Sequence, residues 1–268
     1  MPRYTLDDLR QLMARLRDPK DGCPWDLKQD FRSIVPHTLE EVYELADAIE
    51  SGDTEQIRQE MGDVLFQLIF YSQIAEERGD FEFGDVVDDI TRKLLRRHPH
   101  VFPDGSLASR RGEAAPDEAL IKRRWEEIKA EERNGREQTS VMDDIPLALP
   151  ATNRAAKLQK RASQLGFDWD GVDEVVAALH DELDELSQAM SAGSEEAIAD
   201  ELGDVMFSVI NLSRHLNLDA ETVLRAAGQK FERRFRFVEA RAAERGGAAE
   251  LPAEQLEQFW RDAKRQGL

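Results

Sequence analysis

The chain has 268 residues, of which 36 are Lys or Arg and 55 are Asp or Glu, so its formal net charge is −19 and its isoelectric point lies near 4.7. This acidity argues against nucleic acid or an anionic membrane surface as the main partner, because both are negatively charged themselves. The single cysteine, Cys23, excludes an intrachain disulfide, and every apolar run is too short to span a bilayer. We therefore predict a cytoplasmic protein that binds neither nucleic acid nor membrane.

The first predicted helix lies between Leu6 and Leu16, where apolar residues recur at helical spacing, and it ends before Asp18-Pro19. A turn-rich segment at 21–26 follows and contains Trp25-Asp26, which recurs 144 residues later as Trp169-Asp170. The sequence is therefore repeated, and the repeat begins upstream of the acidic motifs described next.

Two further predicted helices, between residues 39 and 66, carry four acids at regular spacing. An ExxE motif is followed, after fifteen residues, by an ExxD motif, and each of the four acids recurs 141 residues later. The first set is Glu41, Glu44, Glu60 and Asp63, and the second set is Glu182, Glu185, Glu201 and Asp204.

Helical geometry predicts that the acids of each set converge. In both helices of the first half they lie on one flank of an apolar stripe, which we expect to be buried between the helices. Ser51-Gly52-Asp53 between the helices is typical of a helix end followed by an N-cap, and so short a connection makes the helices antiparallel neighbours. The stripes consist of Val42, Leu45, Ala46 and Ile49, and of Met61, Val64, Leu65 and Leu68.

Four carboxylates in close contact repel one another, and a divalent cation removes that repulsion. Ligation by oxygen without His or Cys favours Mg²⁺, with Mn²⁺ as a substitute, and Mg²⁺ also binds substrate phosphates. The alternative is a solvated helix edge, which is the usual role of a lone ExxE motif. Recurrence of all four acids at one offset favours the metal site.

A later helix in each half carries a basic triplet, Lys93, Arg96 and Arg97 in the first and Lys230, Arg233 and Arg234 in the second. Such side chains bind phosphate oxygens well, although surface charge alone is an alternative. Beyond each triplet, Trp125 and Lys129 match Trp260 and Lys264 at an offset of 135. Trp260 either packs the last helix against the core or stacks on a nucleobase.

We find no alternating β pattern of useful length, so the predicted fold class is all-α, with a four-helix core in each of two tandem repeats. The predicted domains are 1–133 and 151–268, joined by a polar linker at 134–150 that contains two prolines. His98-Pro99-His100 follows a helix directly and is interpreted as a helix end and loop rather than a metal-binding tract.

Taken together, these segments resemble the two-domain form of the MazG nucleoside triphosphate pyrophosphohydrolases. The resemblance covers nearly the whole chain, through RLRDPKDGCPWD at 15–26, TLEEVYELADAI at 38–49, RRHPHVF at 96–102, RWEEIKAEER at 124–133, ELGDVMF at 201–207 and QKFERRF at 229–235. It implies an all-α bundle, usually dimeric, that binds Mg²⁺ and cleaves nucleoside triphosphates to monophosphate and pyrophosphate. House-cleaning of non-canonical nucleotides is a further hypothesis, because the sequence does not indicate which base or sugar is preferred.

The resemblance also implies roles for individual residues. The metal ligands would be Glu182, Glu185, Glu201 and Asp204, with the equivalent first-half set, and two-domain relatives use the C-terminal half for catalysis. Lys230, Arg233, Arg234 and Lys264 would hold the substrate, with Trp260 near the nucleoside. One departure is Asp181, which stands where the first half has Glu40 and which puts a metal contact from that position in doubt.

The mechanistic hypothesis is metal-assisted hydrolysis, in which water attacks the α-phosphorus and Glu182 or Glu185 orients or deprotonates it. A carboxylate-bridged di-iron bundle is a rival, but it normally needs ExxH motifs that this chain lacks. A second rival is a catalytically silent nucleotide-binding or regulatory protein. A third is a chain in which one half catalyses while the other regulates or dimerises.

Overall fold

The computed structural model describes residues 3–111, 140–247 and 251–268, together with 117, 120–121, 123–125 and 127–128. The chain divides into two compact units, Met1–Gly135 and Arg136–Leu268. The domain limits predicted at 133 and 151 stay predictions. Part of the predicted linker, 134–139, lies outside the described residues, as does Lys129.

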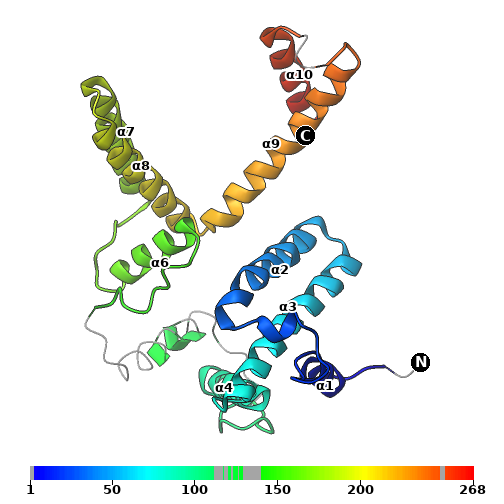
Figure 1. The fold of residues 1–268 in the computed structure, drawn as a ribbon. Helices are drawn as coiled ribbons and strands as arrows, with labels where there is room; N and C mark the ends of the chain where they lie inside the picture. The colour runs from blue at the N-terminus through cyan, green and yellow to red at the C-terminus, as the bar shows by residue number, and fades with distance from the viewer. Residues whose placement is uncertain are drawn as a thin grey trace. The chain divides into compact units, whose positions relative to one another are not determined.

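Each unit contains a long antiparallel helical hairpin, and in unit 2 a second pair, α9 and α10, leads away from it (Figure 1). Unit 1 contains α1 (Leu6–Leu16), the short 3-10 helix η1 (Asp26–Lys28), α2 (Phe31–Ser51), α3 (Thr54–Arg78) and α4 (Phe83–Arg97). Unit 2 contains α6 (Ala151–Ser163), α7 (Val172–Ala192), α8 (Glu195–His215), α9 (Ala220–Ala243) and α10 (Ala253–Arg265). No strand occurs among the described residues, which confirms the all-α class.

Within the described part of the chain, none of the helices combines the length and the apolar character that crossing a bilayer requires.

The two hairpins, α2–α3 and α7–α8, turn through equivalent residues. Gly52 and Gly193 each follow the first helix in the left-handed conformation, both with φ of 76°, which glycine adopts without steric cost. The second helix is then capped by Asp53, which accepts from the amides of Glu55 and Gln56, or by Ser194, which accepts from that of Ala197. The helix end and N-cap predicted at 51–53 are confirmed.

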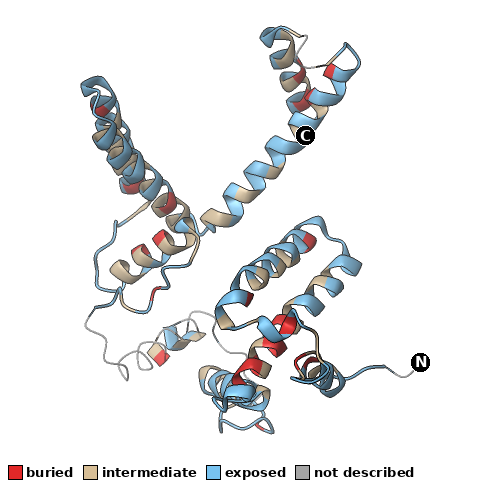
Figure 2. Ribbon diagram, in the orientation of Figure 1, coloured by how far each residue is buried: buried red, intermediate tan, exposed pale blue. Residues whose placement is uncertain are grey.

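Unit 1 has a continuous apolar core between α1, α2 and α3 (Figure 2). Its fully buried side chains are Met13, Ile34, Ile69, Phe70 and Ile74. Beside them the guanidinium of Arg17 lies over the ring of Phe70 and pairs with Glu77, with 2.6 Å between Nη2 and Oε2.

Phe70→Ala is expected to lower the free energy of unfolding of unit 1 by about 3–5 kcal/mol, because it leaves a cavity that the surrounding helices fill incompletely. Denaturant unfolding monitored by circular dichroism measures this change. A loss below about 1 kcal/mol would contradict the assignment of Phe70 to the core.

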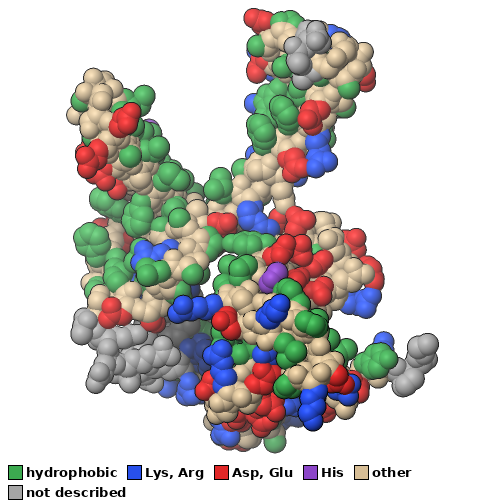
Figure 3. Space-filling model, in the orientation of Figure 1, with side chains coloured by type: hydrophobic (Ala, Val, Ile, Leu, Met, Phe, Trp, Pro, Cys, Tyr) green, Lys and Arg blue, Asp and Glu red, His purple; other side chains and the backbone are tan. Residues whose placement is uncertain are grey.

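The apolar stripes of the hairpins are less buried than the sequence predicts. Leu45, Ala46, Val64 and Leu65 are half-buried, but the outer members of the stripes, Val42, Ile49, Met61 and Leu68, are about half exposed. In unit 2, Leu183, Leu202 and Met206 are similarly exposed, and Figure 3 shows hydrophobic side chains at the surface of the α7–α8 hairpin. The physical reason is that two helices alone cover a narrow strip of each other, so wide stripes need a further neighbour.

Candidate active site

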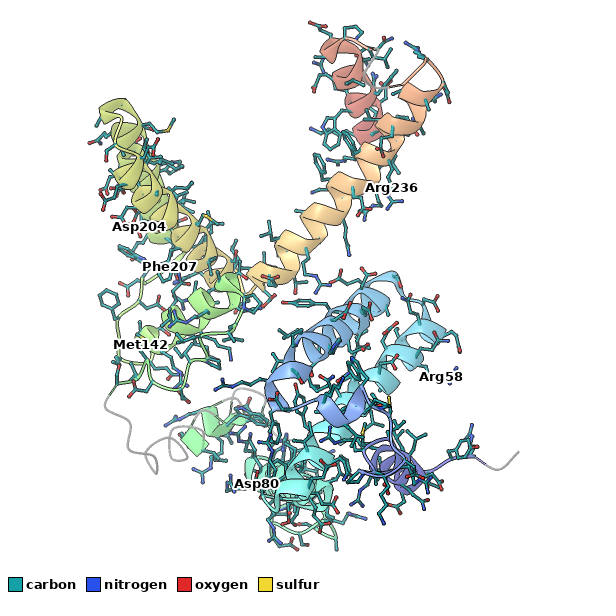
Figure 4. All side chains as sticks on the ribbon, viewed as in Figure 1. Arg58, Asp80, Met142, Asp204, Phe207 and Arg236 are labelled. Carbon is teal, nitrogen blue, oxygen red and sulfur yellow. The ribbon has the colours of Figure 1, made fainter. Side chains whose placement is uncertain are left out.

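The α7–α8 hairpin brings three of the predicted acids of the second half together. Glu182 on α7 and Glu201 and Asp204 on α8 each offer one carboxylate oxygen, and these oxygens lie within 4.8 Å of one another. Asp204 is labelled on the hairpin in Figure 4. Glu185 lies one helical turn beyond Glu182 and is close enough to Glu201 to raise the pKa of that side chain. We call these four side chains the second-half cradle.

The electrostatics of the second-half cradle fit a bound cation. Burial raises the pKa of Glu182, and repulsion by Asp204, Glu185 and Glu201 raises it further. Burial, then repulsion by Glu185 and Asp204, likewise raises the pKa of Glu201. A divalent cation ligated by these oxygens would offset the repulsion, and a set of carboxylates without His or Cys suits Mg²⁺ or Mn²⁺.

The first half repeats this arrangement on α2 and α3. Carboxylate oxygens of Glu41, Glu60 and Asp63 lie within 4.8 Å of one another, and the pKa of Glu41 is raised by burial and by repulsion from Asp63 and Glu44. Gln67 donates a hydrogen bond to Glu41, with 3.5 Å between Nε2 and Oε1. We call Glu41, Glu44, Glu60 and Asp63 the first-half cradle.

Metal-free protein is expected to lose stability as the pH rises, since acids with raised pKa values hold protons more tightly when folded than when unfolded. This loss begins near the ordinary glutamate pKa and continues through the raised pKa values of Glu41, Glu182 and Glu201.

At pH 7, Mg²⁺ at a hundred times its Kd should raise the free energy of unfolding by about 2.7 kcal/mol per site. This gain should shrink at low pH, because protons compete with the cation for the carboxylates. Thermal melts with and without Mg²⁺ at several pH values measure both effects; a Tm unaffected by Mg²⁺ at pH 7 would contradict them.

A pocket of about 520 Å³ adjoins the second-half cradle, and Glu182 belongs to both. Its walls come from α6, α7, α8, the loop 164–171 and the segment before α6, and most of its surface is apolar and aromatic, including Met142, Phe167, Trp169 and Phe207. Figure 4 labels Met142 and Phe207. This volume is in the range of small-molecule sites. Neither the motifs nor the helical periodicity predicted this pocket.

The loop 164–171 is tied to α8 by a charged contact at the pocket wall. Asp168 accepts hydrogen bonds from Arg214, with 2.9 Å between Nη1 and Oδ2, and lies 3.1 Å from Nε2 of His215. The bonds from Arg214 hold the pKa of Asp168 below its ordinary value. This contact positions Phe167 and Trp169 on either side of Asp168.

The two halves differ in the residue at one position of the pocket wall of unit 2. Asn211 lines the pocket, and its counterpart at the 141-residue offset in α3 is Phe70. Phe70 is 1% exposed and belongs to the apolar core of unit 1. A large side chain thus packs in the first half where a short carboxamide borders open space in the second.

The predicted substrate-binding residues of the second half lie on the α9–α10 pair. Trp260 packs against Phe231, with 5.1 Å between ring centroids, and Arg234 and Lys264 each approach its ring at 5.9 Å. Arg234 also donates to the carbonyl of Leu268, with 2.6 Å between Nε and O. Lys230 and Arg233 lie on α9, and none of these five residues lines the pocket beside Glu182.

The contact between arginine and tryptophan recurs in unit 1, where Arg97 lies 5.8 Å from the ring of Trp125. These residues are the counterparts of Arg234 and Trp260 at the offsets found in the sequence. The structure therefore gives Trp260 a packing contact, and the role of these residues in holding the substrate stays a prediction.

The geometry defines a duplicated helical protein with a carboxylate cradle in each half, and comparison with known proteins agrees with it. The MazG nucleotide pyrophosphohydrolase domain matches residues 29–102 and 171–238, which contain the two cradles. The chain is 46% identical to the nucleoside triphosphate pyrophosphohydrolase of Escherichia coli K12 over 98% of both chains. It is 40% identical to the nucleoside triphosphate pyrophosphohydrolase/pyrophosphatase MazG of Thermotoga maritima, over 96% of this chain and 95% of that protein.

A third relative, the uncharacterized protein YabN of Bacillus subtilis, is 38% identical over 97% of this chain and 52% of its own length. The chain belongs to the MazG nucleotide pyrophosphohydrolase family. The family resemblance seen in the sequence and the tandem repeat are both confirmed.

Proposed function

We propose that this protein hydrolyses nucleoside triphosphates, including deoxy and non-canonical forms, to monophosphates and pyrophosphate in the presence of Mg²⁺, and that unit 2 carries the reaction. The observation that carries the proposal is that Glu182 belongs both to a cradle suited to a phosphate-bound cation and to a pocket large enough for a nucleoside. The names of the relatives from E. coli and T. maritima support the same reaction.

In this proposal, Glu182, Glu185, Glu201 and Asp204 hold Mg²⁺, with Mn²⁺ as a substitute. The bound ion would supply Lewis-acid polarisation of phosphate oxygens and a water of lowered pKa. Glu182 or Glu185 orients the attacking water and accepts its proton. Lys230, Arg233, Arg234 and Lys264 would neutralise the charge of the departing pyrophosphate.

The nucleoside binds in the pocket, because Phe167, Trp169 and Phe207 offer apolar and aromatic surface for a base. The adjoining carboxylates would hold the cation that binds the phosphates. Trp260 stays a candidate for contact with the nucleoside.

The proposal is tested by incubating the full chain with canonical, deoxy and oxidised triphosphates and measuring pyrophosphate release with Mg²⁺, with Mn²⁺ and with excess chelator. We expect pyrophosphate and monophosphate in equal amounts, and a loss of at least about a hundredfold in rate without divalent cation. Nucleotide binding without turnover would favour a regulatory protein instead.

A homodimer is part of the same proposal. A second copy would cover exposed apolar side chains of the hairpins, such as Met61, Leu68, Leu202 and Met206. Sedimentation equilibrium is expected to give twice the mass of 30.5 kDa. The cytoplasmic location also stays a prediction.

A further inference from the structure

Two carboxamides, those of Gln159 and Asn211, line the pocket beside Glu182 among its mostly apolar walls. An apolar wall holds any flat base by stacking, whereas a hydrogen-bonding group discriminates between bases. What each carboxamide can offer a ligand depends on which end is already bonded to the protein.

Arg214 determines the orientation of Asn211. The guanidinium donates to Oδ1 of Asn211 from both Nε, at 3.2 Å, and Nη2, at 2.8 Å. A guanidinium has no acceptor atom, so the oxygen of Asn211 must face it and the amide nitrogen must point the other way. Because Arg214 is itself held by Asp168, this orientation is anchored by the loop 164–171.

The backbone determines the orientation of Gln159 in the same way. Its Nε2 donates to the carbonyl of Phe207 at 2.9 Å. A carbonyl can only accept, so the amide nitrogen of Gln159 must face it. Its Oε1 is buried and accepts no hydrogen bond from the described residues. An oxygen buried in this way is out of reach of a ligand in the pocket, so Gln159 serves to hold the backbone of Phe207 at the pocket wall.

We propose that Asn211 reads the edge of the nucleobase by donating a hydrogen bond from its amide nitrogen to a base acceptor. This inference rests on the proposed function, and it assigns the preferred substrates to bases that present a carbonyl at the edge facing Asn211. Ser208, also at the pocket wall, does not discriminate in this way, because a hydroxyl rotates to donate or accept.

The test compares inosine triphosphate, whose base carries a carbonyl next to an N–H group, with the triphosphate of unsubstituted purine riboside, which lacks both. The wild-type full chain is expected to favour inosine triphosphate at least about tenfold in kcat/KM, because the analogue lacks the carbonyl that would accept a hydrogen bond from Asn211. The variant Asn211→Leu should reduce this preference to about threefold or less. Gln188→Leu, a matched change on the exposed surface of α7, should keep the wild-type ratio.

Equal kcat/KM for the two triphosphates in the wild-type protein would overturn the inference while leaving the proposed function intact. Absence of pyrophosphate release from both would overturn the proposed function, and this inference with it. The wild-type comparison needs no substitution, so a variant that fails to fold, as judged by circular dichroism, leaves the test decisive.

Discussion

Glu182→Gln is expected to lower kcat/KM for pyrophosphate release by at least about a hundredfold, because it removes one charge from the carboxylates proposed to hold Mg²⁺ and one candidate proton acceptor. Glu182 also forms part of the pocket wall, so its charge lies where phosphates and nucleoside would meet. Initial rates with saturating Mg²⁺, measured alongside helical content by circular dichroism, test this expectation. Glu185→Gln should have a similar effect.

The chain supplies a matched control for this variant. Glu41 occupies the equivalent position in α2 and also has a raised pKa, but the apolar core of unit 1 contains Phe70 where unit 2 has Asn211. Glu41→Gln is therefore expected to retain turnover within about threefold, as is Glu44→Gln. Equal losses from Glu41→Gln and Glu182→Gln would contradict the assignment of catalysis to unit 2 and would indicate that both halves take part.

Convergence of the acids could be predicted from the sequence because it depends on local rules. Helical spacing places Glu182 and Glu185 on one flank, and a connection as short as Gly193-Ser194 makes the next helix an antiparallel neighbour. Neither step requires knowledge of distant packing. The same rules apply to the first half, so the cradle appears in both units.

Burial of the apolar stripes was predicted less well. The spacing of residues such as Met61 and Leu68 shows that they share a helix face, but it does not show how much of that face a single partner helix covers. The exposed remainder depends on what else packs against the hairpin. A periodic pattern therefore predicts the orientation of a side chain better than its burial.

The pocket could not be predicted from periodicity, since it depends on side-chain size where α6, α7, α8 and the loop 164–171 meet. One signal was nevertheless present in the repeat. Comparison of the halves at the 141-residue offset pairs Phe70 with Asn211, a change from a large apolar to a short polar side chain within otherwise similar helices. Such a difference between repeats indicates a pocket in one half once the packing shows that the larger residue fills a core in the other half.

Asn211→Phe is expected to lower kcat/KM for nucleoside triphosphates by at least about tenfold, because it introduces into unit 2 the side chain that packs in the core of unit 1. The change should act mainly through KM, as an occupied pocket weakens binding of the nucleoside while the carboxylates of the second-half cradle remain in place. The rise in Tm produced by Mg²⁺ should persist, and this separates a blocked pocket from a damaged cradle.

Asn211→Leu distinguishes steric blocking from loss of a hydrogen bond, since leucine is close to asparagine in size. It should retain turnover of purine riboside triphosphate, which cannot use the hydrogen bond, whereas Asn211→Phe should lose it. If Asn211→Phe hydrolyses that analogue as well as the wild-type protein does, the nucleoside binds elsewhere, and the surface around Trp260 on the α9–α10 pair becomes the place to look for it.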